Sequence, residues 1–175
     1  MDSELGSPLE PAAGRQLGPG RYFFDALAVG DWYRTGSVEI TADLISKYAE
    51  LSGDRYRLHL EDEAAREFGF VSRIAHGLLI LGLADGLKFQ SPVQLDAVAS
   101  LGWDIKFTKP VFVGDRISAC LTIHARRSTS QGDRGIVTLA VSVRNQDEMV
   151  VQHGFNRLMM RLICADISQA SHPSP

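Results

Sequence analysis

A carboxylate and an imidazole lie five residues apart in the segment Ser52–His59, at Asp54 and His59. Gly53 stands beside the carboxylate, where the backbone must turn sharply. An Asp and a His held in one short loop can divide acid/base work, since one takes a proton from water while the other holds that water or protonates a carbon. This pair therefore indicates addition of water to an activated double bond, or its removal. In the structural alternative, Asp54 caps the turn and His59 packs at the edge of an element.

The segment from His76 to Phe89 places apolar side chains on every side of a helix. We expect such a helix to be surrounded by protein. Its glycines, among them Gly77, either permit close backbone approach or break the segment into loops. His76 is a base or ligand in one interpretation. In the other, which is commoner at a helix start, it orients a backbone group.

Two shorter helices flank the Asp54 loop. Thr41 is a good N-cap, and apolar residues recur at helical spacing after it until Gly53 ends the segment. Acidic residues crowd the start of a second helix, expected from Glu61 to Phe68, where the helix dipole favours negative charge. The candidate pair therefore lies between two helices.

The remaining elements read as strands. Alternating apolar residues and turn signals predict five of them: Trp32 to Ile40, Val98 to Phe107, Asp115 to Ser128, Gly135 to Asn145 and Met149 to Leu162. Successive strands joined by short turns favour an antiparallel meander with one buried face. A fully apolar helix and a one-sided sheet satisfy each other if the sheet wraps round the helix, so the fold class is α+β.

Composition narrows the class of function. The 175 residues, 45% hydrophobic, suit one domain with a sizeable core. A net charge of -3 gives no reason to expect nucleic acid. Cys120 and Cys164 lie far apart, and His124 and His153 have no clustered ligands, so we expect no metal and a reduced, cytoplasmic protein. Asp85 in the apolar helix needs a partner, because burying an unpaired carboxylate is costly.

The ends of the chain differ from its middle. Residues 1–20 are rich in proline and glycine, lack a secretory signal and predict a disordered arm. The apolar helix is too short to cross a bilayer, so no membrane association is expected. We therefore predict one folded domain over 21–164 and a disordered tail over 165–175.

Three separated motifs resemble the MaoC-like dehydratases, which include the (R)-specific enoyl-CoA hydratases. The family loop reads Ser-Gly-Asp-x-Asn-Pro-(Leu or Ile)-His, and a later segment ends Ile-(Ala or Val)-His-Gly-(Leu or Met)-Leu. This chain matches at three places and in the same order: Ser52–Asp54 with Leu58–His59, Ile74–Leu79, and Phe107–Val111. The resemblance covers roughly Phe23 to Leu162.

This resemblance implies a hot-dog fold, in which a curved antiparallel sheet wraps a central helix, here Gly77 to Phe89. It further implies a homodimer or higher homo-oligomer, an acyl-thioester substrate such as acyl-CoA, a place in fatty acid metabolism and no cofactor. Asp54 and His59 would be the catalytic pair. Gly77, with His76 beside it, would bind the thioester oxygen, a role that suits the unpaired N–H groups and partial positive charge of a helix start.

The chain departs from the family at Tyr56 and Arg57, which stand in place of Asn and Pro. An amide that could pin the loop and a ring that stiffens it are both missing. Three functions therefore stay open: a hydratase or dehydratase of 2-enoyl and 3-hydroxyacyl thioesters, an acyl-CoA thioesterase, and a non-catalytic acyl-thioester binding protein. The fold alone does not choose between them.

Overall fold

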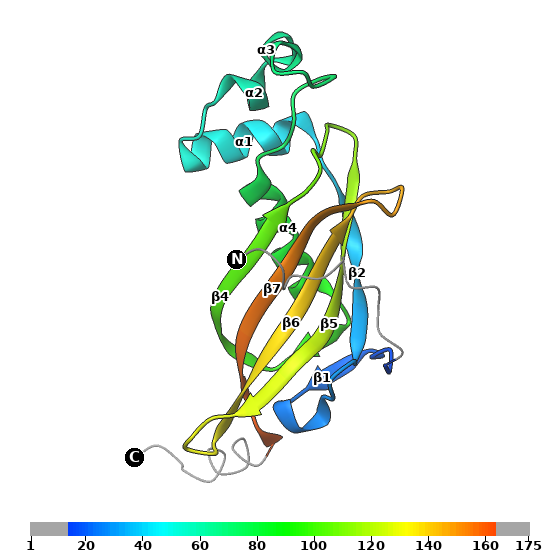
Figure 1. Cartoon of the computed structure of the whole chain (residues 1–175), viewed down its shortest axis with the longest axis vertical. Coiled ribbons are helices and arrows are strands. Elements are labelled where there is room, and N and C mark those ends of the chain that lie inside the picture. Colours follow the sequence, from blue (N-terminus) through cyan, green and yellow to red (C-terminus); the bar gives the residue numbers. More distant parts are fainter. Residues whose placement is uncertain (1–13, 164–175) are drawn as a thin grey trace, which may run out of the picture.

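A curved antiparallel sheet lies against one long helix, and three shorter helices gather beyond one end of the sheet (Figure 1). The computed structural model describes residues 14–163. Its elements in chain order are: β1 (Gly20–Tyr22), the 3-10 helix η1 (Phe24–Ala26), β2 (Trp32–Glu39), α1 (Ala42–Ser52), α2 (Arg57–Leu60), α3 (Asp62–Glu67), α4 (Gly77–Gln90), β3 (Val93–Leu95), β4 (Ala97–Phe107), β5 (Arg116–Ser128), β6 (Arg134–Arg144) and β7 (Val150–Arg161).

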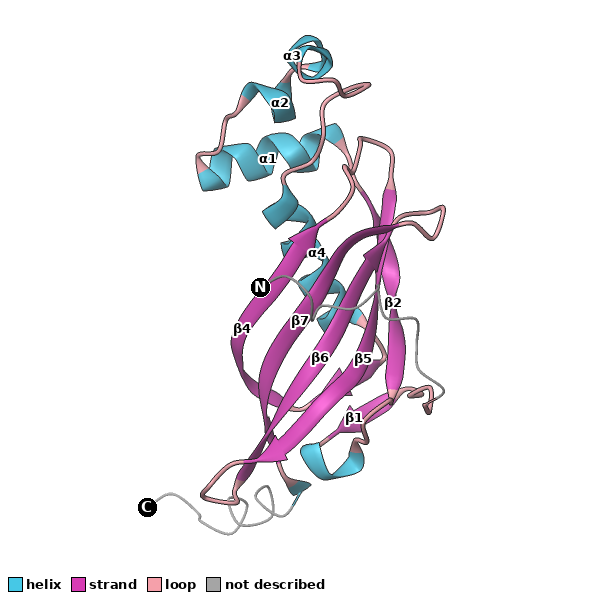
Figure 2. Cartoon of the chain, viewed as in Figure 1, coloured by secondary structure: helices cyan, strands magenta, loops and turns pink. Residues whose placement is uncertain are grey.

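The main sheet has the strand order β2-β5-β6-β7-β4, and every neighbouring pair is antiparallel (Figure 2). Only β5, β6 and β7 form the expected meander. The predicted pairing of β4 with β5 is wrong, because β4 lies at the far edge beside β7. Strands that follow one another in sequence are often neighbours, but not always. Here the chain crosses between β4 and β5, so that the two lie on opposite sides of the central strands.

The inner face of the sheet forms the core. The predicted alternation is confirmed: eight inward residues of β5 and β6 are each at most 3% exposed, namely Ile117, Ala119, Leu121, Ile123, Val137, Leu139, Val141 and Val143. The helix α4 turns its own buried side chains toward this core, among them Leu79, Ile80 and Ala84. The sheet therefore holds α4 by apolar packing, and the start of α4 is fixed relative to the strands.

One side of α4 faces away from the sheet. Leu78 is 60% exposed and Phe89 is 69% exposed, so the expectation that protein surrounds the whole helix is wrong for a single chain. The edge strand β4 also exposes apolar residues, including Val98, Leu101 and Phe107. A sheet of five strands covers only part of a helix, so the uncovered side of α4 leaves apolar side chains exposed.

Part of the predicted arm is packed. Leu17 is buried, its N–H donates to the carbonyl oxygen of Trp32 (2.8 Å), and Arg15 forms an ion pair with Asp31 (2.6 Å). Residues 14–20 thus depart from the predicted arm, because one apolar side chain and backbone pairing along β2 hold them. Residues 1–13 and 164–175, which hold the rest of the arm and the whole predicted tail, lie outside the described residues.

The helical layer holds the candidate loop. Thr41 Oγ1 accepts a hydrogen bond from Leu44 N–H (3.1 Å), as expected for the N-cap of α1. Gly53 ends α1 with φ 78°, a left-handed conformation that glycine adopts easily. The short helix α2 was not predicted, because four residues are too few to show a period. Within residues 14–163, no helix combines the length and apolarity needed to span a membrane.

The backbones of β4 and β7 approach closely at Gly154, which gives a test of the fold. Its φ is +155°, and a Cβ there would overlap the carbonyl oxygen of Asp104. We expect Gly154→Ala to lower the free energy of unfolding by about 3 kcal/mol or more, through backbone strain and overpacking. Urea unfolding measures the loss.

Gly36→Ala is the matched control, because Gly36 is also in a strand and a Cβ there would meet nothing within 4 Å. Equal stability of the two variants would contradict the assigned β4–β7 register.

Candidate active site

Asp54 lies in the turn that follows α1, and hydrogen bonds between residues close in sequence fix its backbone. Ser52 Oγ donates to the carbonyl oxygen of Tyr48 (2.7 Å) and accepts from the N–H of Asp54 (3.2 Å). Asp54 Oδ1 in turn accepts from the N–H of Tyr56 (3.3 Å). The carboxylate therefore caps its turn, as the structural alternative proposed. The side chain remains exposed, so turn capping leaves it open to a ligand.

His59, on α2, has one ring nitrogen committed to the protein. Its Nδ1 lies 2.8 Å from the carbonyl oxygen of Ile74. A carbonyl oxygen can only accept, so Nδ1 carries the proton in this arrangement. In the neutral ring, Nε2 then keeps a lone pair. The hydrogen bond thus selects the tautomer that a general base requires.

His76 is buried at the start of α4, at 2% exposure. Its Nε2 donates to the backbone carbonyl oxygen of Asp54 (2.9 Å), so His76 holds the candidate loop against the helix. Its ring lies against that of His59, with centroids 3.9 Å apart. Burial, and after it the nearby His59, lowers the pKa of His76 below the ordinary value of 6.5, which favours a neutral ring.

These three residues form one cluster. Asp54, His59 and His76 each offer an oxygen or nitrogen atom within 4.8 Å of the others. Such a set could in principle hold a metal ion. Each ring already gives one nitrogen to a backbone carbonyl, so each has one nitrogen left for an ion or a proton. The same three groups can also take part in proton transfer.

A cavity of about 270 Å³ opens beside the cluster. His59 and Gly77 line it, as do apolar residues and Gln152. Gly77 begins α4, where backbone N–H groups lack acceptors within the helix. A Cβ on Gly77 would lie 2.6 Å from the ring of Phe107, so only glycine leaves this approach undisturbed. Asp54 is not among the residues that line the cavity, and its backbone carbonyl accepts from His76.

Gln152 was missed by sequence reasoning. It lies on β7, is 2% exposed, and its Nε2 donates to the carbonyl oxygen of Gly77 (2.7 Å). The signal was available: alternation along β7 places Gln152 on the inner face of the sheet, where a polar residue is unusual.

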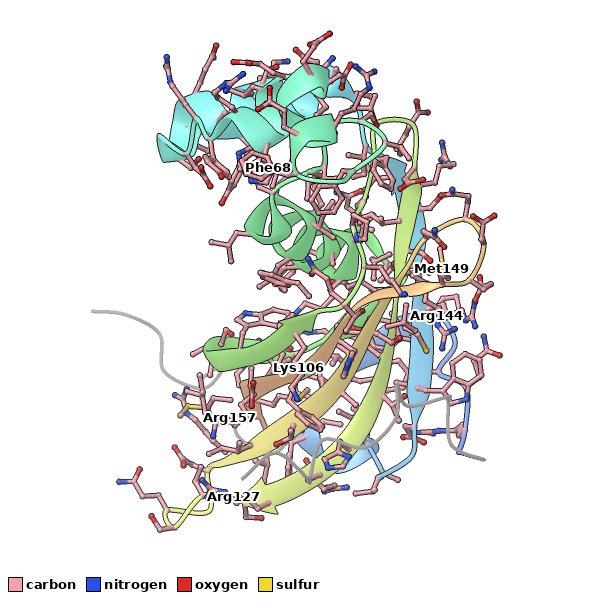
Figure 3. The ribbon with its side chains drawn as sticks, turned by 45° about the horizontal axis from the view of Figure 1, so that its top comes forward. Phe68, Lys106, Arg127, Arg144, Met149 and Arg157 are labelled. Carbon is pink, nitrogen blue, oxygen red and sulfur yellow. The ribbon has the colours of Figure 1, made fainter. Side chains whose placement is uncertain are left out.

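The two residues that depart from the family pattern behave differently. Arg57 forms an ion pair with Glu61 across one turn of helix (2.9 Å) and both are exposed, so Arg57 serves α2. Tyr56 lies at the site: its ring centroid is 6.3 Å from that of His59 and 5.7 Å from that of Phe68. Figure 3 shows Phe68 in the helical layer that stands over the start of α4.

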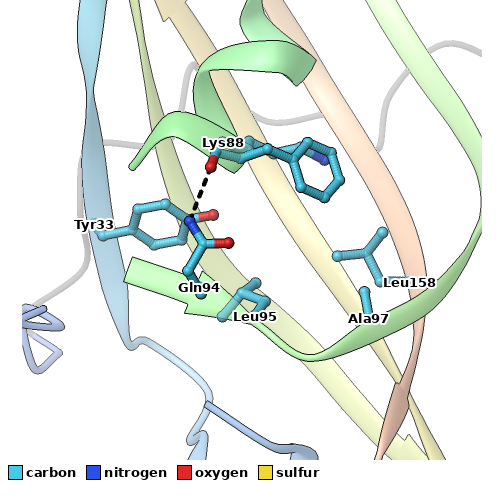
Figure 4. A pocket seen from close by; sticks show the side chains of 7 residues that line it. Tyr33, Lys88, Gln94, Leu95, Ala97 and Leu158 are labelled. Carbon is cyan, nitrogen blue, oxygen red and sulfur yellow. Dashed lines mark hydrogen bonds between the residues drawn. The ribbon is translucent and has the colours of Figure 1, made fainter. Parts of the chain in front are cut away.

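Other residues with possible chemical roles lie away from the cluster. His124 packs against Phe155, with ring centroids 4.8 Å apart. Asp85 has the partner that its position required, an ion pair with Lys88 (2.7 Å). Near Lys88, at the far end of α4, is a second cavity of about 30 Å³ (Figure 4). This cavity is much smaller than the one beside the cluster.

Comparisons with known proteins identify the family of the chain. The sequence model of the MaoC like domain matches residues 26–146. An (R)-specific enoyl-CoA hydratase from Aeromonas caviae is 36% identical over 115 residues, 65% of this chain and 77% of that one. A mitochondrial 3-hydroxyacyl-[acyl-carrier-protein] dehydratase from Arabidopsis thaliana is 31% identical over 129 residues, 73% of this chain and 74% of that one.

Among solved structures, a conserved hypothetical protein from Mycobacterium tuberculosis with a double hot-dog fold superimposes with a TM-score of 0.71 and 20% identity. The match covers 91% of this chain and 53% of that one. The present chain therefore has the hot-dog fold, with one such unit.

The burial of His76 predicts a pH-dependent stability. Because its pKa is lowered in the folded protein, the unfolded chain binds more protons just below pH 6.5. The stabilisation is therefore complete above the unfolded pKa and is lost as the pH falls through the folded one. Urea unfolding at about pH 7.5 and about pH 5 should show the wild type weakened at the lower pH.

His76→Gln, which can still donate to the Asp54 carbonyl, should show a smaller difference between the two pH values. An unchanged difference would mean that another group causes the loss.

Proposed function

Because the chain belongs to the MaoC-like dehydratase family, we propose that it is a hydro-lyase that reversibly adds water to 2-enoyl thioesters to give 3-hydroxyacyl thioesters. Acyl-CoA is the proposed substrate. The observation that carries the proposal is the hydrogen bond from His59 Nδ1 to Ile74, which leaves a lone pair on Nε2, next to a carboxylate and the start of α4.

In the proposed reaction, Asp54 and His59 hold a water molecule against the β-carbon. His59 Nε2 removes a proton as the water oxygen bonds to that carbon. The electron pair of the double bond moves toward the thioester, and the resulting enolate oxygen is stabilised by the backbone N–H of Gly77. The imidazolium of His59 then returns a proton to the α-carbon. Atoms and charge balance without a cofactor, so none is proposed.

The low pKa of His76 supports this division of roles. A second positive ring stacked on His59 would oppose the formation of the imidazolium. Burial keeps His76 neutral, so it can hold the Asp54 carbonyl without adding charge to the site. His76 is therefore proposed as a positioning residue.

We also propose that two copies of the chain form a homodimer through α4 and β4. The open side of α4 and the edge strand β4 together expose Leu78, Phe89, Val98, Leu101 and Phe107. Contiguous apolar surface of this kind is typical of an interface. Phe107 also lines the cavity, so a partner on this surface would close one wall of the site.

The first test of the function is turnover. Purified protein mixed with crotonyl-CoA should remove the conjugated absorbance, and Asp54→Asn and His59→Gln should each lower kcat/KM by about 100-fold or more. Asp43→Asn and His124→Gln are matched controls, because both residues are exposed and remote from the cluster. Full activity of Asp54→Asn would defeat the assignment, and thiol release from saturated acyl-CoA would favour the thioesterase alternative.

The second test is the oligomeric state. Light scattering after size-exclusion chromatography should give the mass of a dimer for the wild type, and Leu101→Lys should shift it toward a monomer, because a charge in an apolar interface is costly. Val29→Lys is the control, since Val29 is 61% exposed just before β2, the opposite edge strand from β4. A monomeric wild type would remove the interface.

A further inference from the structure

Gln152 contacts the start of α4 from the sheet. It pairs with Phe107 on β4 and with Val143 on β6, and its side chain turns inward, at 2% exposure. The carbonyl oxygen of Gly77 can only accept, so the atom 2.7 Å away is the amide nitrogen. The orientation of the carboxamide is therefore fixed, and its oxygen Oε1 points elsewhere.

Within residues 14–163, the buried Oε1 of Gln152 has no hydrogen-bond partner. Leaving a buried acceptor unpaired is costly. Because Gln152 lines the cavity beside Gly77, a turn of its carboxamide toward the cavity would let a donor on a bound molecule satisfy this oxygen. An acyl-CoA and its hydrated product carry such donors as N–H and O–H groups.

Asn156, two inward positions farther along β7, provides a comparison. It is fully buried, yet every one of its polar atoms is satisfied within the protein: Oδ1 accepts from Lys88 Nζ, and Nδ2 donates to Ser100 Oγ and to the carbonyl oxygen of Gly102. A residue that only ties β7 to its neighbours is expected to look like Asn156. Gln152 differs: it makes one bond inside the protein through Nε2, and its Oε1 has no partner among residues 14–163.

The bond to Gly77 also has a geometric consequence. Gly77 is the first residue of α4, so a bond from the sheet to its carbonyl oxygen anchors the start of the helix. The Gln152 amide holds its carbonyl from one side, and the ring of Phe107 occupies the place of a Cβ. Fixing the Gly77 carbonyl restrains the conformation of the residue whose N–H faces the thioester oxygen in the proposed reaction.

We propose that Gln152 is a positioning residue for acyl-thioester chemistry: its Nε2 sets the backbone of Gly77, and its Oε1 accepts a hydrogen bond from the bound thioester. This inference rests on the proposed function, since it assigns the thioester oxygen to Gly77.

A spectroscopic test does not depend on turnover. A conjugated dienoyl thioester absorbs at longer wavelength when a donor polarises its carbonyl, so 2,4-hexadienoyl-CoA reports on Gly77. We expect a red shift on binding to the wild type, and its loss in Gln152→Met, which has a similar size and no amide. Gln131→Met is the control and should keep the shift, because Gln131 is exposed in the turn between β5 and β6. Thermal unfolding checks that Gln152→Met is folded.

Kinetics with crotonyl-CoA separate the two halves of the carboxamide. Gln152→Met should lower kcat by about 10- to 100-fold, less than or equal to the loss of an oxyanion donor itself, and should raise KM by about fivefold, the value of one neutral hydrogen bond. Gln152→Glu keeps an acceptor and loses the amide donor, so it should lower kcat while KM stays near that of the wild type. Because it buries a carboxylate, thermal unfolding checks this variant as well.

The outcomes are distinct. A wild type that binds the dienoyl-CoA with a red shift but does not hydrate crotonyl-CoA overturns the proposed function, and loss of the shift in Gln152→Met still supports the role of Gln152. A folded Gln152→Met with the wild-type shift and kcat overturns that role, and so does a wild type that gives no shift.

Discussion

The hydrogen bond from His76 Nε2 to the backbone carbonyl of Asp54 joins the two parts of the molecule on which the site depends. Asp54 belongs to the helical layer, which makes few contacts with the sheet, whereas His76 begins the helix that the sheet holds. One buried imidazole therefore fixes the position of the loop relative to the core. The stacked ring of His59, itself bonded to the carbonyl oxygen of Ile74, completes the connection. Without these contacts the carboxylate would be an ordinary turn residue.

The same contacts set the protonation of the site. Each imidazole gives one nitrogen to a backbone carbonyl, which fixes its tautomer. Burial then separates the two rings in function, because it disfavours charge on His76 while His59 is only partly buried beside the cavity. Two chemically identical side chains 3.9 Å apart can therefore serve as a scaffold and as a base.

Much of this arrangement could be predicted from the sequence, because it follows from local patterns. Alternation in β5 and β6, the Thr41 cap and the glycine after α1 each depend on a few neighbouring residues. The pairing of β4 with β7 could not be read in this way, since it depends on how the sheet closes round α4 and not on the turn between β4 and β5. The open side of α4 was missed for a related reason: periodicity shows that a helix needs apolar neighbours, but not whether the same chain supplies them.

In the candidate site, too, the sequence predicts what depends on local patterns and misses what depends on distant contacts. Motif spacing predicted Asp54, His59, His76 and Gly77, and the structure brings the first three into one cluster beside the fourth. Gln152 depends on a contact across 75 residues, so no local pattern gives its role.

The chemistry of Gln152 nevertheless marks it as a residue with a special role. Proteins rarely bury a polar atom without a partner, and where they do, the unpaired atom indicates strain or a ligand. Within residues 14–163, His76 Nδ1 and Gln152 Oε1 are both such atoms: His76 directly precedes Gly77, the first residue of α4, and Gln152 contacts Gly77 from the sheet. An apolar residue at either place would avoid that cost. The fold therefore gives up stability at the point where the proposed reaction needs its donors and acceptors.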